Sequence, residues 1–145
     1  ILLDTQGRLI HIDFGFILGL APGGNFALET CPFKLPLDYV DVLGGLDSQV
    51  FMDFVVAFTC GFLTLQAQSS RLVTLLEMTT QDSPLPCFHG KDTEDVLNKL
   101  RMRLMPHLDK SDTVAFCLDL IRESYNNYYQ RQYDYFQWLT NGIMS

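Results

Sequence analysis

The chain divides into a first part rich in glycine and proline and a longer remainder with helical periodicity. Between Phe14 and Tyr39 no apolar periodicity is sustained, and four glycines and three prolines interrupt the segment. Proline lacks a backbone N–H and glycine weakens helices and strands, so neither element is expected to cross this segment. We therefore predict a loop of about 25 residues, and connections of that length in compact domains are usually functional or disordered.

The residues before the loop predict a β-hairpin over 1–13. Two apolar runs, at 1–3 and 9–12, flank a short polar connection that contains Gly7. Apolar runs separated by a glycine-containing turn are a common hairpin signal.

The residues after the loop predict about five helices. Apolar spacing is helical over 47–78, and Gly61 together with the polar stretch 66–70 suggests a break followed by a second helix. Asp92 is predicted to cap a helix that runs to Leu104, and Ser111 to cap the next helix, over 112–125. A last helix over 129–141 should end at Gly142. The predicted fold is thus mainly α.

Composition excludes several classes of protein. With 145 residues, 48% of them hydrophobic and 19% charged, the chain has a globular rather than a disordered composition. Its net charge of −7 argues against nucleic acid as a partner, because neutralising phosphates needs clustered cations. The longest apolar run, 54–65, is shorter than the roughly 20 residues of a membrane-spanning helix. No targeting segment is evident.

The four cysteines show no CxxC spacing, which argues against a zinc or thioredoxin-like site; they are Cys31, Cys60, Cys87 and Cys117. We expect reduced, buried, cytosolic thiols. The chain begins without methionine inside a predicted strand, so we expect it to be part of a longer protein.

The tripeptide Asp13-Phe14-Gly15 stands where the predicted hairpin meets the long loop. A carboxylate at a strand end is rigidly placed and can bind Mg²⁺ beside nucleotide phosphates. Alone the tripeptide is weak evidence, because Asp13 could simply cap a turn and Phe14 could fill the core. A hairpin before it and a loop after it are, however, the setting in which kinases use this motif. The Ala-Pro-Glu that closes this loop in protein kinases is absent.

Several further segments follow in a specific order: 11–18 (HIDFGFIL), 32–35 (PFKL), 85–90 (LPCFHG) and 139–144 (LTNGIM). With these motifs the whole chain resembles the C-terminal part of the catalytic domain of phosphatidylinositol 4-kinases, most closely the type III beta enzymes. The resemblance implies the C-terminal lobe of a lipid-kinase, protein-kinase-like fold over 1–145. The N-terminal lobe and the catalytic loop, with its base, are expected upstream of Ile1.

The resemblance implies roles for six residues. Asp13 would bind the Mg²⁺, or alternatively Mn²⁺, of bound ATP, and Phe14 and Gly15 would complete that motif. Leu2 and Ile12 match positions that lie against the adenine ring. The segment 16–36 would be the activation loop that admits the lipid headgroup. Lys34 would contact the lipid phosphate, although a solvated loop lysine is the plain alternative.

The substrate argument rests on charge, because Lys34 is the only cation between Arg8 and Arg71. The resemblance allows a comparison with phosphoinositide 3-kinases that act on multiply phosphorylated headgroups, which carry several basic residues in the corresponding loop. A single cation suits phosphatidylinositol, and it fits a phosphatidylinositol 3-kinase equally well. The sequence match favours the 4-kinase, working peripherally on Golgi or other endomembranes from the cytoplasm, in phosphoinositide signalling and membrane traffic.

A non-enzymatic reading also stands: a truncated helical module that binds a membrane or a protein partner. An Asp-Arg-His-Asn-x-Asn run directly upstream of Ile1 would favour the enzyme, and unrelated sequence there would favour the module. In either case we expect these 145 residues alone to be inactive, because phosphoryl transfer also needs groups that they do not contain. Protein partners are not identified by the sequence. The aromatic residues of the last helix could belong to the core or touch a bilayer.

Overall fold

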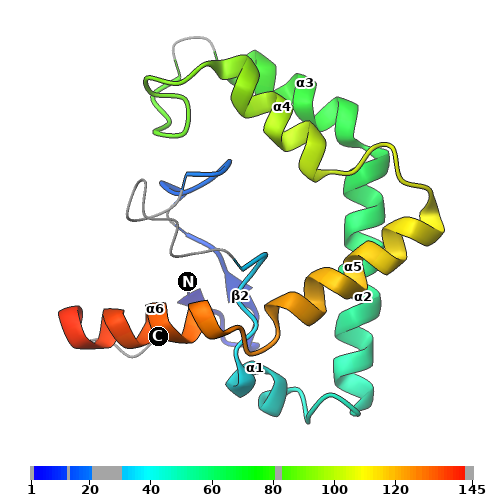
Figure 1. Ribbon diagram of the computed structural model, residues 1–145, viewed down its shortest axis with the longest axis vertical. Helices are drawn as coiled ribbons and strands as arrows, with labels where there is room; N and C mark the ends of the chain where they lie inside the picture. Colours follow the sequence, from blue (N-terminus) through cyan, green and yellow to red (C-terminus); the bar gives the residue numbers. More distant parts are fainter. Residues whose placement is uncertain (1, 13, 21–30, 81–82, 143–145) are drawn as a thin grey trace.

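The computed structural model describes residues 2–12, 14–20, 31–80 and 83–142. These residues form six helices and one pair of short antiparallel strands, so the predicted mainly α class is confirmed. In Figure 1 helices α3 and α4 lie side by side, α5 crosses the long helix α2, and α6 extends away from that group.

Strand β1 (Leu2–Leu3) pairs with β2 (Leu9–Ile10), placing Leu2 opposite Ile10 and Leu3 opposite Leu9. The hairpin expected over 1–13 is thus reduced to two residue pairs, and residues 11–12 adopt no strand. Two strands of this length are not independently stable in water. Helix packing must therefore supply the stability of the fold.

Helix α1 (Leu37–Val42) begins inside the segment predicted to be loop, so the prediction of a loop up to Tyr39 is wrong at its end. The helix has six residues, which is too short to show an apolar period. It forms because Val40, 1% exposed, is buried in the core.

The predicted helical region over 47–78 is confirmed as two helices, α2 (Gln49–Ala67) and α3 (Ser69–Thr80), separated at Gln68. Ser48 caps α2 by accepting a hydrogen bond from the Phe51 N–H at 3.0 Å. The predicted break falls in the polar stretch, and Gly61 lies inside α2. Glycine costs only about 1 kcal/mol in a helix interior, which the packing of a long helix easily outweighs.

Helix α4 (Thr93–Arg103) begins as predicted at Asp92, whose side chain accepts from the Glu94 N–H. Helix α5 (Lys110–Ser124) is capped by Asp109 rather than by Ser111. Helix α6 (Tyr128–Asn141) ends as predicted at Gly142, where φ is 66°. That left-handed conformation favours glycine because it has no Cβ.

The first core cluster joins the end of the predicted loop, residues 31–36, to three helices. Its buried residues come from the 31–36 segment, α1, α2 and α5: Leu35, Val40, Phe51 and Ile121. Aromatic rings surround them, and Phe33 stacks on Phe58 with ring centroids 5.0 Å apart. Such pairs add about 0.5–1.5 kcal/mol beyond area burial. The end of the predicted activation loop is thereby fixed to α2.

The second core cluster lies between the start of the predicted loop and α4. Cys87, Phe88 and Val96 are buried here. Four partly buried residues pack against them: Ile17, Leu18, Leu20 and Leu85. The LPCFHG motif therefore serves as the packing surface for residues 17–20.

Helix α2 has 19 residues and a mean hydropathy of 1.7, so by length and composition it could cross a membrane. It extends beyond the apolar run 54–65 at both ends. Only Phe51 of this helix is buried, but Phe54, Val55 and Phe58 pack on the first core cluster. This contact covers one side of the helix, and all of its other residues are exposed or half-buried.

The cysteines are all free thiols, but they are not all buried. Cys87 and Cys117 are fully buried, Cys31 is half-buried and Cys60 is exposed. The expectation of buried thiols is therefore wrong for Cys60, because its position on α2 lies away from the helix's packed face.

Candidate functional site: the ends of the predicted activation loop

The turn between β1 and β2 is organised by Asp4. Its Oδ1 accepts hydrogen bonds from the backbone N–H groups of Gln6, at 2.9 Å, and Arg8, at 2.8 Å. Its Oδ2 pairs with Arg8 Nε at 2.9 Å. The Arg8 N–H is the main reason that the pKa of Asp4 lies below its ordinary value. This turn sets the direction in which β2 leads toward residue 13.

The predicted nucleotide-binding residues lie along these strands and just after them. Leu2 and Ile12 are about half exposed, at 54% and 48%, and Ile12 lies two residues beyond the ladder. Phe14 is 60% exposed, so it does not fill the core as the plain alternative required. Gly15 is partly buried. Asp13, the predicted metal ligand, lies outside the described residues.

The described part of the chain contains no group of three or more His, Cys, Asp or Glu side chains able to hold a metal ion. Asp13, the one residue of this chain predicted to bind the metal, is not among these described residues. A single carboxylate suits one ligand position of Mg²⁺, which usually keeps water and phosphate oxygens in its other positions.

The predicted activation loop is anchored at both described ends. At its start, residues 17–20 turn back on themselves, with the Leu20 N–H donating to the Ile17 carbonyl at 3.1 Å, and they pack on the second core cluster. At its end, Leu35 forms a parallel bridge with Tyr125, and the Asn126 N–H donates to the Leu35 carbonyl at 3.0 Å. Residues 21–30 between these anchors lie outside the described residues.

Lys34 is held at the second anchor by an ion pair. Its Nζ lies 2.8 Å from Asp134 Oδ1 on α6, and the two side chains are 34% and 23% exposed. The plain alternative of a solvated lysine is thus not what the structure shows. Sequence reasoning missed Asp134, because nothing in a single sequence links positions that are 100 residues apart.

A small pocket of ≈ 200 Å³ adjoins this ion pair, lined by Cys31, Pro32, Phe33, Lys34, Gln130 and Tyr133. Gln130 Oε1 is buried and has no hydrogen-bond partner among the described residues. An ammonium and an unpaired carbonyl oxygen on one pocket suit a ligand with both an anionic oxygen and a donor group.

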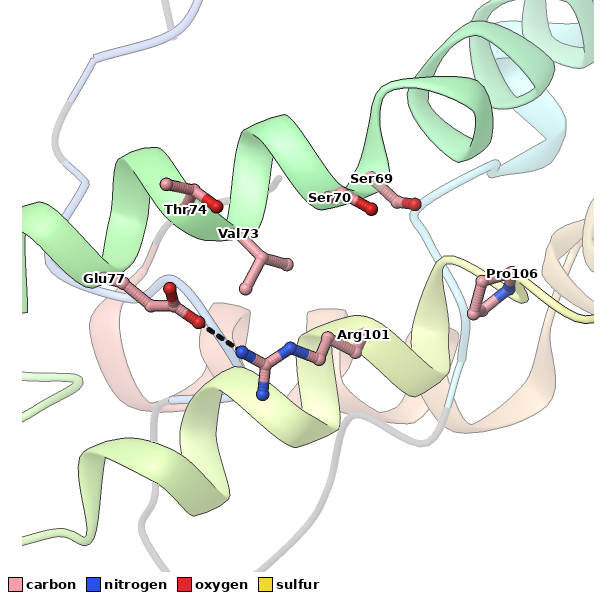
Figure 2. A pocket seen from close by; sticks show the side chains of 7 residues that line it. All are labelled: Ser69, Ser70, Val73, Thr74, Glu77, Arg101 and Pro106. Carbon is pink, nitrogen blue, oxygen red and sulfur yellow. Dashed lines mark hydrogen bonds and ion pairs between the residues drawn. The ribbon is translucent and has the colours of Figure 1, made fainter.

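A second pocket, of ≈ 280 Å³, lies between α3 and α4 and contains none of the predicted site residues. Figure 2 shows Ser69, Ser70, Val73 and Thr74 along α3, with Val73 pointing toward α4 and Pro106 lying beyond the end of α4. Arg101 on α4 reaches across it to the carboxylate of Glu77.

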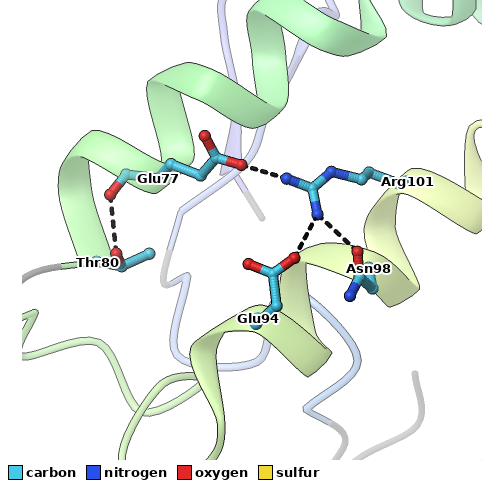
Figure 3. Close-up of polar contacts among 5 residues, drawn as sticks. All are labelled: Glu77, Thr80, Glu94, Asn98 and Arg101. Atoms are coloured by element: carbon cyan, nitrogen blue, oxygen red, sulfur yellow. Dashed lines mark hydrogen bonds and ion pairs between the residues drawn. The ribbon is translucent and has the colours of Figure 1, made fainter.

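Arg101 joins several partners at this point. Its Nη1 donates to Glu94 Oε1 at 2.9 Å and to Asn98 Oδ1 at 2.6 Å, while Nη2 donates to Glu77 (Figure 3). The Thr80 hydroxyl donates to the Glu77 carbonyl within the last turn of α3. Because the guanidinium is already surrounded by carboxylate and amide oxygens, the network ties α3 to α4 and offers no anion site.

A larger cavity of ≈ 710 Å³ lies between residues 18–19, Phe62 and α4. Its rim carries Lys91 and Arg103, and its floor includes Val96 and Leu104. None of the residues predicted for nucleotide, metal or substrate binding lines it.

Comparison with known proteins identifies the family. Residues 1–90 match the family described as phosphatidylinositol 3- and 4-kinase. The chain is 40% identical over 146 residues to phosphatidylinositol 4-kinase PIK1alpha of Candida albicans. The aligned region covers 100% of this chain and 15% of that protein. It is 38% identical over 144 residues to phosphatidylinositol 4-kinase beta of Danio rerio and of Sorex araneus, covering 99% of this chain.

The chain spans only 17% and 18% of those two animal proteins. The family match includes both strands, the Asp13-Phe14-Gly15 tripeptide, Lys34 and the LPCFHG segment, and the alignments to relatives extend through α6. Since the match covers well over half of its residues, this chain belongs to the phosphatidylinositol 3- and 4-kinase family.

Proposed function

We propose that this chain is the C-terminal part of the catalytic domain of a phosphatidylinositol 4-kinase of the type III beta kind. The intact enzyme transfers the γ-phosphate of ATP to the 4-hydroxyl of phosphatidylinositol. The observation that carries the proposal is 38–41% identity, over essentially the whole chain, to proteins named phosphatidylinositol 4-kinases.

In the proposed enzyme, Asp13 supplies one carboxylate ligand to Mg²⁺ or Mn²⁺, and the cation neutralises charge on the ATP phosphates. Leu2 and Ile12 offer apolar surface to the adenine ring, and their half-exposed side chains are available for such a contact. Phe14 and Gly15 lead the chain from the metal ligand into the activation loop.

Lys34 is proposed to contact the phosphate of the lipid. Its segment is seated firmly, because the Phe33 N–H donates to the buried Ser124 hydroxyl at 3.3 Å and Leu35 is bonded to the α5–α6 junction. A lysine on such a segment presents its charge at a fixed place. One ammonium matches one phosphodiester, which is the only phosphate of phosphatidylinositol.

The base that accepts the hydroxyl proton, the catalytic loop and the N-terminal lobe are proposed to lie in the longer protein, outside these 145 residues. The proposed enzyme works from the cytoplasm as a peripheral protein on Golgi or other endomembranes, in phosphoinositide signalling and lipid phosphorylation.

The test is a product analysis with the full-length protein that contains this chain. Labelled ATP, Mg²⁺ and vesicles of phosphatidylinositol in phosphatidylcholine are incubated with the protein, and the position of the new phosphate on the inositol ring is determined. Phosphatidylinositol 4-phosphate is expected. The 3-phosphate would instead identify a 3-kinase, and no turnover would favour a non-enzymatic helical module. The isolated 145-residue chain serves as the control and should show no activity above a blank.

A further inference from the structure

The ion pair between Lys34 and Asp134 is built into the fold and is not a loose surface contact. The two residues are 100 positions apart, their charged atoms are 2.8 Å apart, and their side chains are only 34% and 23% exposed. By comparison, Asp119 and Arg122 on α5 form a pair of 2.7 Å whose side chains are 57% and 78% exposed. Exposed pairs of that kind contribute little, since solvent screens them.

The backbone on both sides of this ion pair is fixed independently of it. On one side, Phe33 and Leu35 are hydrogen-bonded to the α5–α6 junction. On the other side, Asn127 caps α6 and accepts from the Tyr129 N–H at 3.0 Å. Asp134 therefore projects from a helix whose start is anchored next to the segment that carries Lys34.

Helix α6 also forms one wall of the small pocket beside Lys34. It contributes Gln130 and Tyr133, while the 31–34 segment contributes the other side. Asp134 follows Tyr133 directly, so the carboxylate that holds Lys34 and the pocket wall belong to the same helical turn. Any ligand that enters this pocket meets an ammonium whose position α6 has set.

We propose that Asp134 is a positioning residue for Lys34, and that α6 thereby forms part of the lipid-binding site; this rests on the proposed function. A lysine side chain is long and flexible, and holding it in one geometry before the ligand arrives lowers the cost of binding. An ammonium has three N–H donors, so the bond to Asp134 is compatible with a contact to a phosphate oxygen.

The test is a double-mutant cycle in the full-length protein, with Asp134→Asn, Lys34→Ala and the two combined. The Michaelis constant for phosphatidylinositol in mixed vesicles and the rate of ATP hydrolysis without lipid are measured. Asp134→Asn should raise the lipid KM about 3- to 10-fold, the range for losing the preorganisation of one side chain. Hydrolysis without lipid should stay within about twofold, since the nucleotide contacts are elsewhere. On the Lys34→Ala background, Asp134→Asn should have no further effect.

The matched control is Asp119→Asn, which removes a carboxylate from an exposed ion pair and should leave the lipid KM unchanged. If Asp134→Asn does not give folded protein by circular dichroism, Asp134→Ser takes its place under the same criteria. An unchanged or lowered KM for phosphatidylinositol in Asp134→Asn would overturn the inference. It would also be overturned if Asp134→Asn raised this KM by the same factor in the Lys34→Ala protein as in the parent.

The two levels of the proposal fail differently. If Lys34→Ala raises KM while Asp134→Asn does not, only the positioning role is wrong. If Lys34→Ala leaves KM unchanged, the lipid contact assigned to Lys34 is wrong and the positioning role falls with it.

Discussion

The side-chain amide of Gln66 on α2 donates a 2.9 Å hydrogen bond to the fully buried hydroxyl of Thr113 on α5. The same nitrogen lies 2.6 Å from the Met105 carbonyl and 3.2 Å from the Leu108 carbonyl, in the connection between α4 and α5. Met105 has φ of 47°, a left-handed conformation that is uncommon for a residue with a side chain. Gln66 thus joins three parts of the chain that are distant in sequence.

Replacing Gln66 should therefore destabilise the fold. Gln66→Ala removes the donor to the fully buried Thr113 hydroxyl and to two carbonyls of half-buried residues. Each buried group left unsatisfied costs about 1–3 kcal/mol. We expect the free energy of unfolding, measured by urea denaturation, to fall by roughly 2–3 kcal/mol. Gln132→Ala, at an exposed position on α6, is the matched control and should change it by less than about 0.5 kcal/mol. Equal effects of the two variants would show that Gln66 does not hold this junction.

Removing Arg101 should loosen α3 from α4. Arg101→Ala breaks the contacts to Glu77, Glu94 and Asn98. Because the ion pairs are partly exposed, the free energy of unfolding should fall by only about 0.5–1 kcal/mol. Hydrogen exchange of the α3 backbone should become faster in the variant. The control Arg122→Ala removes only the exposed pair with Asp119 and should have no measurable effect. Salt at ~1 M should reduce the difference in the free energy of unfolding between Arg101→Ala and the parent protein, because salt screens ion pairs. An unchanged difference would show that the effect is not electrostatic.

The cysteines should differ in their reactivity. Burial raises the pKa of the Cys117 thiol above its ordinary value of 9.0, so this thiol stays protonated and unreactive at pH 8. Iodoacetamide at pH 8 should modify exposed Cys60 first and leave Cys117 unmodified until the chain unfolds, as mass spectrometry of peptides can show. Cys60→Ser should abolish the fast phase. Fast labelling of Cys117 in folded protein would contradict its burial.

The Cys117 thiol also makes the stability of the fold depend on pH. Because folding raises the pKa of Cys117, the unfolded chain loses this proton first as pH increases. The stability it contributes is constant below pH 9.0 and declines as pH rises above that value. Urea midpoints measured from pH 7 to pH 10 should follow this trend, and Cys117→Ala should reduce the slope above pH 9.

If the proposed function is correct, Asp13 should be indispensable for turnover by the full-length protein. Asp13→Asn removes the charge proposed to hold the metal, and kcat should fall by at least ~10³ because the transferring phosphoryl group loses its neutralising cation. Asp119→Asn is the matched control, since it removes a carboxylate from an exposed ion pair on α5, and its kcat should stay within about twofold. Near-normal turnover with Asp13→Asn would move the proposed metal site elsewhere.

Predictions based on local chemistry agreed with the structure where one or two turns of backbone decide the outcome. Asp92 caps α4 and Gly142 ends α6, because a side-chain acceptor at a helix start and a positive φ at a helix end are local requirements. The sequence predicts Ser111 as the cap of α5, whereas the structure uses Asp109. Both residue types are good caps, and only the position of the folded helix distinguishes them.

Other features depended on partners that are distant in the chain. Helix α1 exists because Val40 enters a core made by Phe51 and Ile121, and no period over six residues could reveal that. The two anchors of the predicted activation loop likewise require packing against residues 87–96 and 121–126.

The sequence by itself determined the helical class, the start of α4, the end of α6 and the family, because each depends on residue type and order along the chain. The tertiary structure alone decided that Lys34 is paired with Asp134 and that Gln66 bonds to Thr113. The physical reason is that a charge pair or a buried hydrogen bond forms wherever folding brings two groups within about 3 Å, and sequence separation places almost no limit on which groups these are.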